Sequence, residues 1–220
     1  MLFWKRKKPQ PTGASAGPID LSRSKIPFDA ILLSLGLGRQ STALDIGAGG
    51  FVGASTTRYL IDRLQNPVVG LELAPERCDA LKEKFGAALD VRNGDIRTYD
   101  FGGKTFDVVV ADVDCFLIPE VFDDWLPNTL HGLLKPGGFA ILVNFDHIKD
   151  PIDASAGISA EVQEGVLPFL IKKFGDRRVT GDNVRSAYAN DPLFEGIDAV
   201  GKWNGRENVL NWVILRKRSS

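Results

Sequence analysis

The segment that most constrains this chain is residues 42–53, TALDIGAGGFVG. Apolar residues of a short buried strand come first, an acid and a glycine-rich turn follow, and a helical pattern then begins. Gly47 and Gly49 let the backbone turn tightly, and they carry no Cβ that would hold a flat ligand away. A helix that starts just after the turn presents unpaired backbone N–H groups. The segment therefore predicts a strand–turn–helix unit of an α/β fold with a ligand at the turn.

Asp45 indicates which kind of ligand such a turn can hold. A carboxylate beside a pyrophosphate would repel it, whereas a cationic or amino-bearing ligand can use the negative charge. The acid-x-Gly-x-Gly pattern of Asp45, Gly47 and Gly49 resembles motif I of the class I S-adenosylmethionine-dependent methyltransferases, which wraps the methionine and ribose parts of the cofactor. Gly47, Gly49 and Gly53 also suit a dinucleotide site, so the turn alone leaves a dehydrogenase open.

Later positions fit the same cofactor. Glu72 lies near the carboxyl end of the next apolar run, one strand–helix–strand unit after the turn, where it could accept two hydrogen bonds from a ribose diol. In the family an acid and an apolar residue after the third strand meet the adenine, and Asp95-Ile96 matches, although Asn93-Gly94-Asp95 is also an ordinary turn. The resemblance implies these cofactor-binding residues: Asp45, Gly47, Ala48, Gly49, Glu72, Leu73, Asp95, Ile96 and Asp112.

Composition bounds the class of protein and its partners. The 220 residues are 44% hydrophobic and 25% charged, which is ordinary for one domain with a full core. The net charge of −1 gives no global basic field, so no nucleic-acid partner is evident. Cys78 and Cys115 are far apart in apolar contexts, and we expect reduced thiols and a cytoplasmic location. No apolar run approaches the ~20 residues of a membrane span, and the start does not resemble a signal peptide.

The chain divides into a tail and one domain. Residues 1–24 are rich in Pro, Gly, Ser and Lys, and we expect a disordered basic tail. Phe3 and Trp4 beside four basic residues could make a weak contact with an anionic membrane surface, but a solvated tail is favoured. Residues 25–220 are predicted to form a single methyltransferase domain.

The apolar pattern predicts alternating strands and helices. A terminal hairpin around Asn204-Gly205 would place an antiparallel strand in an otherwise parallel sheet, which marks the methyltransferase family and argues against a dehydrogenase. Leu-Lys-Pro-Gly-Gly at 134–138 resembles the family's turn before the fifth strand. The fold predicted is α/β, a Rossmann-like three-layer α/β/α sandwich with a seven-stranded, mostly parallel sheet and an antiparallel C-terminal strand. Helices are expected at 27–37, 52–65, 75–85, 120–135 and 159–174, and strands at 43–46, 68–73, 87–91, 105–113, 139–145, 197–203 and 209–216.

Candidate catalytic residues follow the central strands. Asp112 ends the apolar run 105–113 and is the first choice for the ligand cleft, with Asp114 second. His147 follows the fifth strand and is a general-base candidate. The irregular segment 175–196 supplies Tyr188, with Arg185, as acceptor contacts. Asp112, Asn144 and Asp146 offer oxygen ligands, but their spacing is not diagnostic, so no metal is predicted.

The resemblance implies transfer of a methyl group from S-adenosylmethionine to an acceptor that the sequence does not identify, with a small molecule favoured. The region 106–114 lacks the Asn/Asp-Pro-Pro-aromatic sequence of enzymes that methylate amino groups of nucleic-acid bases. Two alternatives stay open. One is an aminopropyltransferase of the spermidine synthase type, although that family separates two acids by two residues and Asp112 and Asp114 are separated by one. The other is a non-catalytic cofactor-binding protein of the same fold.

Overall fold

The computed structural model describes residues 35–49, 55–111, 125–146, 191–200 and 209–218, together with Pro168, Lys172 and Ser186. Within these residues seven strands form one sheet in the order β3-β2-β1-β4-β5-β7-β6. The strands are β1 (Ala43–Ile46), β2 (Val68–Glu72), β3 (Leu89–Asn93), β4 (Phe106–Ala111), β5 (Leu134–Asp146), β6 (Phe194–Val200) and β7 (Val209–Lys217).

The direction of the strands confirms the predicted topology. β1 pairs in parallel with β2 and β4, β2 with β3, and β4 with β5. β7 lies between β5 and β6 and is antiparallel to both. The terminal hairpin is therefore part of the main sheet, and one strand runs against an otherwise parallel set, as the resemblance implies.

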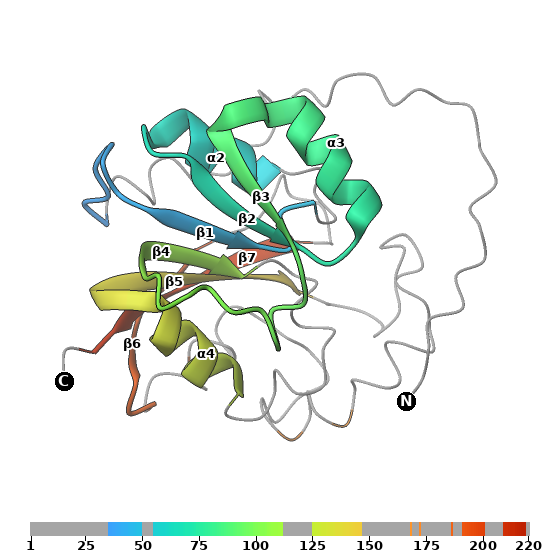
Figure 1. The fold of residues 1–220 in the computed structure, drawn as a ribbon. Coiled ribbons are helices and arrows are strands. Elements are labelled where there is room, and N and C mark those ends of the chain that lie inside the picture. The colour runs from blue at the N-terminus through green and yellow to red at the C-terminus, as the bar shows by residue number, and fades with distance from the viewer. Residues whose placement is uncertain are drawn as a thin grey trace.

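Helices cover both faces of the sheet (Figure 1). They are α2 (Ser55–Arg63) and α3 (Pro75–Phe85) on one face, followed by the short 3₁₀ turn η2 (Gly86–Ala88), and α4 (Trp125–Leu133) on the other face. The prediction of three layers is confirmed. Among the described residues no helix has the length and apolar character that a membrane span needs.

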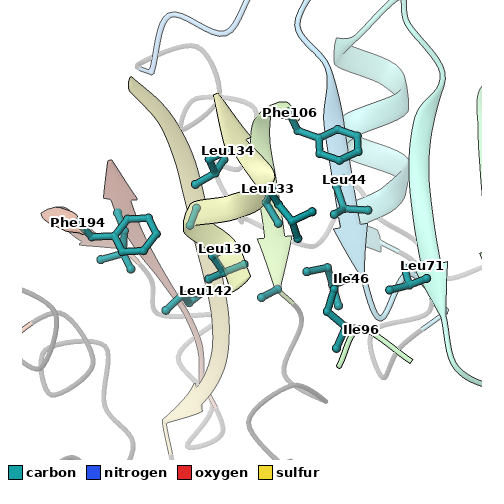
Figure 2. Packing of buried hydrophobic residues seen from close by; sticks show 14 of the residues in the cluster. Leu44, Ile46, Leu71, Ile96, Phe106, Leu130, Leu133, Leu134, Leu142 and Phe194 are labelled. Carbon is teal, nitrogen blue, oxygen red and sulfur yellow. The ribbon is translucent and has the colours of Figure 1, made fainter. Parts of the chain in front are cut away.

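Two apolar cores lie between these layers. One packs Leu60 of α2 and Leu81 of α3 against the sheet. The other packs Leu130 and Leu133 of α4 against strand residues that include Phe106 (Figure 2). Every residue of β1 and β2 is buried, because strands inside a parallel sheet are covered on both faces. The acidic ends of these two strands are thus held by a rigid centre.

Residue preferences explain where α3 begins and ends. Pro75 occupies its first turn, where the missing N–H costs nothing, as predicted. Gly86 ends it with a φ of 51°, a conformation that favours glycine. The third strand then starts at Leu89 rather than at residue 87, because η2 occupies the intervening residues.

The junction of α4 and β5 differs from the prediction. The helix expected to run to residue 135 ends at Leu133, and β5 begins at Leu134 rather than at residue 139. Leu134 already pairs with Phe106, and the register shifts before Val108 pairs with Phe139. The Leu-Lys-Pro-Gly-Gly turn, with Gly137 at a φ of 70°, therefore forms an irregular start of the strand. Of the helix expected at 27–37, Leu35 and Gly36 form a turn, and residues 27–34 lie outside the described residues, as does the tail.

Candidate cofactor site at the carboxyl edge of the sheet

The glycine turn is attached to the end of the neighbouring strand. The backbone N–H groups of Gly47 and Ala48 both donate to the carbonyl oxygen of Leu71, at 2.8 and 3.3 Å. Gly47 has a φ of 81°, which residues with a Cβ rarely adopt, so the turn needs glycine here. Because β1 and β2 are parallel, this attachment brings the acids that end them to the same edge of the sheet.

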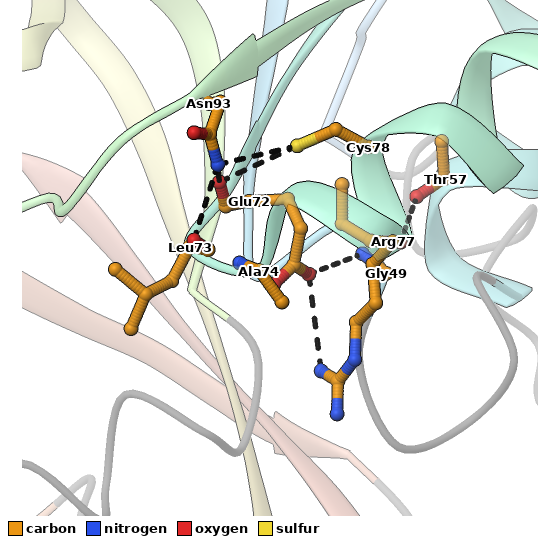
Figure 3. Close-up of polar contacts among 9 residues, drawn as sticks. Gly49, Thr57, Glu72, Leu73, Ala74, Arg77, Cys78 and Asn93 are labelled. Atoms are coloured by element: carbon orange, nitrogen blue, oxygen red, sulfur yellow. Dashed lines mark hydrogen bonds and ion pairs between the residues drawn. The ribbon is translucent and has the colours of Figure 1, made fainter. Parts of the chain in front are cut away.

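Glu72 is the buried acid at this edge, with 4% of its surface exposed. Its Oε2 accepts a hydrogen bond from the backbone N–H of Gly49 at 3.0 Å, and its Oε1 accepts one from the N–H of Ala74 at 2.9 Å (Figure 3). Arg77 of α3 places a guanidinium nitrogen 3.9 Å from Oε2. Each carboxylate oxygen retains acceptor capacity for a further donor, such as a hydroxyl of a ribose diol.

Gly49 is required by this carboxylate. A Cβ at residue 49 would lie 2.7 Å from Oε2 of Glu72 and 3.0 Å from Cβ of Arg77. The sequence predicted that the missing side chain at Gly49 gives room to a ligand and to the turn. The structure adds that the same space holds the Glu72 carboxylate against the turn.

Asp45 lies beneath the turn, with 1% of its surface exposed. Its Oδ2 lies 2.5 Å from the hydroxyl of Thr57 on α2, and that hydroxyl is 3.1 Å from the carbonyl oxygen of Ala48. Its Oδ1 is buried and has no hydrogen-bond partner among the described residues. Burial raises the pKa of Asp45 to about 7; the hydrogen bond with Thr57 opposes this rise, and the charge of Glu72 adds to it. A direct contact between Asp45 and a cofactor stays a prediction.

Leu73, Asp95 and Ile96 were predicted to bind the cofactor, the last two at the adenine, and they follow the ends of β2 and β3. Leu73 is 64% exposed and projects away from Arg77 (Figure 3). Ile96 is buried and belongs to the core on the α4 face. Asp95 accepts hydrogen bonds from the Arg97 guanidinium on both oxygens, and mainly because of them its pKa is lower than usual. Asp95 is therefore ionised at neutral pH, and an exposed apolar side chain lies at the same edge.

Three residues that sequence reasoning missed complete this edge. The Asn93 side chain donates to the carbonyl oxygens of Glu72 and Leu73, at 2.9 and 3.1 Å, and so connects β3 to the end of β2. Arg77 lies beside Glu72, and Thr57 beside Asp45. The sequence offered one signal for Thr57, because two adjacent threonines on a helix expected to pack on the sheet indicate a buried polar group.

The predicted catalytic residues stay predictions. Asp112, Asp114, His147, Arg185 and Tyr188 lie outside the described residues. Asn144 and Asp146 lie on β5, in register with Asn211 and Val209 of β7. In the part of the chain that the structure describes, no group of three His, Cys, Asp or Glu side chains could hold a metal ion.

The residues of this site lie within a segment that is similar to a known protein family. Residues 43–138 match the family model described as a methyltransferase domain, a span that contains the glycine turn, Glu72 and the Leu-Lys-Pro-Gly-Gly segment. A search of curated proteins found no match.

Solved structures share the fold at low sequence identity. The N-methyltransferase NodS from Bradyrhizobium japonicum WM9, in complex with S-adenosylhomocysteine, aligns with a TM-score of 0.58 and 15% identity over 93% of each chain. A putative sarcosine dimethylglycine methyltransferase from Galdieria sulphuraria gives 0.59 and 15%, over 86% of this chain and 83% of that one. The 1,6-didemethyltoxoflavin-N1-methyltransferase from Burkholderia thailandensis, with S-adenosylhomocysteine bound, gives 0.55 and 19%, over 88% and 78%.

These similarities agree with the strand order of the sheet, and the matched segment contains the acids and glycines near the ends of β1 and β2. Residues 43–138 are thus similar to the methyltransferase-domain family, and the sheet has the Rossmann-like fold of the class I methyltransferases among the similar structures.

Proposed function

We propose that this protein transfers a methyl group from S-adenosylmethionine to a small-molecule acceptor. The observation that carries the proposal is the position of the Glu72 carboxylate, which is buried and held by the N–H groups of Gly49 and Ala74 at the edge that the glycine turn shares. Its remaining lone pairs suit a ribose diol. The exposed Leu73 offers an apolar surface for an adenine ring next to this acid.

The cofactor would supply a methyl group on a positively charged sulfur, which is an activated centre for displacement by a nucleophile. The chain's own task is then alignment. Holding the reacting atoms in near-attack geometry can contribute up to roughly 7–11 kcal/mol, and a general base is needed only for an acceptor that arrives protonated. Gly47, Gly49 and Glu72 would bind and orient the nucleoside, while Asp112, His147 and Tyr188 are the candidates to orient the acceptor or remove its proton.

A small molecule is the acceptor class that the comparisons favour. The similar structures include enzymes described as acting on sarcosine and dimethylglycine and on 1,6-didemethyltoxoflavin. Both descriptions name small nitrogen compounds. The location proposed for the protein is the cytoplasm, where thiols such as Cys78 stay reduced.

Calorimetry with four ligands tests the proposal. S-adenosylmethionine and S-adenosylhomocysteine are expected to bind with dissociation constants on the order of micromolar. Preference for decarboxylated S-adenosylmethionine would instead favour the aminopropyltransferase, and preference for NAD would favour a dehydrogenase. Tight binding of S-adenosylmethionine without turnover on any amine, hydroxyl or thiol acceptor would favour the non-catalytic alternative.

A further inference from the structure

The hydroxyl of Thr57 has one proton and two neighbours that could accept it. Thr57 Oγ1 lies 2.5 Å from Asp45 Oδ2 and 3.1 Å from the carbonyl oxygen of Ala48. The Ala48 carbonyl can only accept a hydrogen bond, and an ionised Asp45 could likewise only accept. One hydroxyl proton cannot serve both contacts fully. A proton on Asp45 removes the conflict, because Asp45 then donates to Thr57 and Thr57 donates to Ala48.

The surroundings of Asp45 favour the protonated form independently. The side chain is 1% exposed, and its second oxygen meets no donor among the described residues. An ionised carboxylate in that position would keep most of its desolvation cost, whereas a neutral carboxyl leaves only one carbonyl oxygen without a partner.

The charged neighbours do not reverse this preference. Among the described residues, the charge that acts on Asp45 is that of Glu72 on β2, which opposes ionisation. Arg77 of α3 is paired with Glu72. The strand neighbours in register with Asp45 are Gly70 on β2 and Val110 on β4, and neither titrates. The helix α2 contributes the neutral Thr57.

We propose that Asp45 acts as a neutral carboxylic acid that positions the glycine turn, through a chain of hydrogen bonds from Asp45 to Thr57 and from Thr57 to the Ala48 carbonyl. Asp45 is thus a positioning residue for cofactor binding, and this role rests on the proposed function. Ionisation of Asp45 would turn the Thr57 hydroxyl toward the carboxylate and leave the Ala48 carbonyl without its donor. The turn would then be less ordered for the cofactor.

The direction of the pH dependence distinguishes this role from simple attraction of charge. If the turn must be held by a protonated Asp45, affinity falls as pH rises through the pKa of Asp45, by up to about tenfold between pH 6 and 8. If Asp45 instead attracts the positive sulfur as a carboxylate, affinity for S-adenosylmethionine rises over the same range. S-adenosylhomocysteine, which lacks that charge, would then show little change.

The test is calorimetric titration of S-adenosylhomocysteine and S-adenosylmethionine between pH 6 and 8. The variant D45N keeps a neutral donor toward Thr57, so it should bind within about threefold of the unmodified protein at pH 6. Its affinity should also lack the fall with rising pH that titration of Asp45 causes. T57V, which has no hydroxyl, should bind about tenfold more weakly at pH 6, and the conservative T57S should restore binding. Any pH dependence that remains in D45N belongs to the ligand or to other groups.

Three results would overturn the proposal. They are a loss of affinity above tenfold in a folded D45N at pH 6, a rise in affinity for S-adenosylmethionine with pH that D45N abolishes, and equal binding by T57V and the unmodified protein. If neither ligand binds the unmodified protein, the proposed function fails, and infrared difference spectra decide the protonation separately. A protonated-carboxyl band at pH 6 that D45N lacks supports a neutral Asp45, and its absence contradicts it.

Discussion

Two buried acids, Glu72 and Asp45, lie near the ends of neighbouring strands and have different hydrogen-bond partners. Glu72 is held by two backbone N–H groups and lies near the guanidinium of Arg77. Asp45 has only the Thr57 hydroxyl among the described residues. A buried carboxylate is stabilised by the donors around it, so equal burial has different consequences for the two side chains. Glu72 is suited to accept from a ligand, and Asp45 is suited to support the turn.

Replacing Glu72 with alanine should weaken the binding of S-adenosylhomocysteine at least about tenfold, because it removes both acceptors proposed for the ribose diol. The N–H groups of Gly49 and Ala74 would also lose their partner, so some loss of stability is expected. Calorimetry gives the affinity, and urea unfolding gives the stability.

The matched control for this variant is D62A, because Asp62 is an exposed acid on α2 that pairs with Arg58. It should leave the affinity unchanged. Unaltered affinity in a folded E72A protein would show that the ribose assignment of Glu72 is wrong.

The titration of Asp45 should make the free energy of unfolding depend on pH. Its pKa is about 7 in the folded chain and near 3.8 when unfolded, so the folded state binds more protons between these values. The contribution of Asp45 to the free energy of unfolding therefore falls as pH rises across this window. D45N should gain stability over the unmodified protein from pH 4 to 7, by roughly 4 kcal/mol at most. Urea unfolding at several pH values measures the difference.

D107N is the control, because its effect on the free energy of unfolding should be opposite in sign to that of D45N. Burial alone would raise the pKa of Asp107, but hydrogen bonds from Lys135 and Thr42 to its Oδ2 outweigh burial and lower it. Its contribution to stability is thus present above its unfolded pKa and is lost as pH falls through the lowered folded value. D107N should cost stability at pH 7 and less in acid. A stability difference for D45N that does not change with pH would contradict the account of Asp45.

At the scale of elements, the antiparallel strand β7 and its neighbour β6 complete the core on the α4 face. Phe194 of β6 is fully buried, and the ring of His131 on α4 meets it edge-on with the ring centres 6.1 Å apart. Lys217 of β7 donates to the carbonyl oxygens of His131 and Leu134, both at 2.7 Å. The C-terminal strands therefore brace the junction between α4 and β5.

Phe194→Ala should lower the free energy of unfolding by about 3–5 kcal/mol, since it leaves a cavity in a fully packed core. Thermal or urea unfolding measures the loss. Leu73→Ala is the contrasting change, because Leu73 is largely exposed and should contribute little to stability. It should instead weaken nucleoside binding. A small loss of stability for F194A would mean that β6 is not integral to the core.

The sequence predicted elements wherever a local signal and the tertiary contacts agree. Pro75 predicted the start of α3, and the Asn204-Gly205 hairpin predicted the antiparallel end of the sheet. The start of β5 was wrong because pairing of Leu134 with Phe106 overrides a turn signal at Pro136-Gly137. Thr57 and Asn93 were missed because their roles depend on partners that are distant in sequence, Asp45 and the end of β2.

At the scale of the whole molecule, one side of the sheet carries the proposed nucleoside site and the other side carries the packed C-terminal strands. The half of the sheet formed by β1, β2 and β3 carries the glycine turn, Glu72 and Asp95, which form the proposed nucleoside site. Its other half is formed by β5, β7 and β6, which pair with one another and stabilise the sheet. The similar structures share the overall fold with this chain at 13–19% identity.

Hydrogen exchange with and without S-adenosylhomocysteine tests most directly whether the cofactor binds at the carboxyl ends of β1, β2 and β3. Binding at this edge should slow exchange in residues 43–49, 70–78 and 93–97, where the glycine turn, Glu72 and Asp95 lie. Exchange in β6 and β7 should not change. Protection confined to the C-terminal strands, or binding that leaves 43–49 and 70–78 unprotected, would contradict binding at this edge.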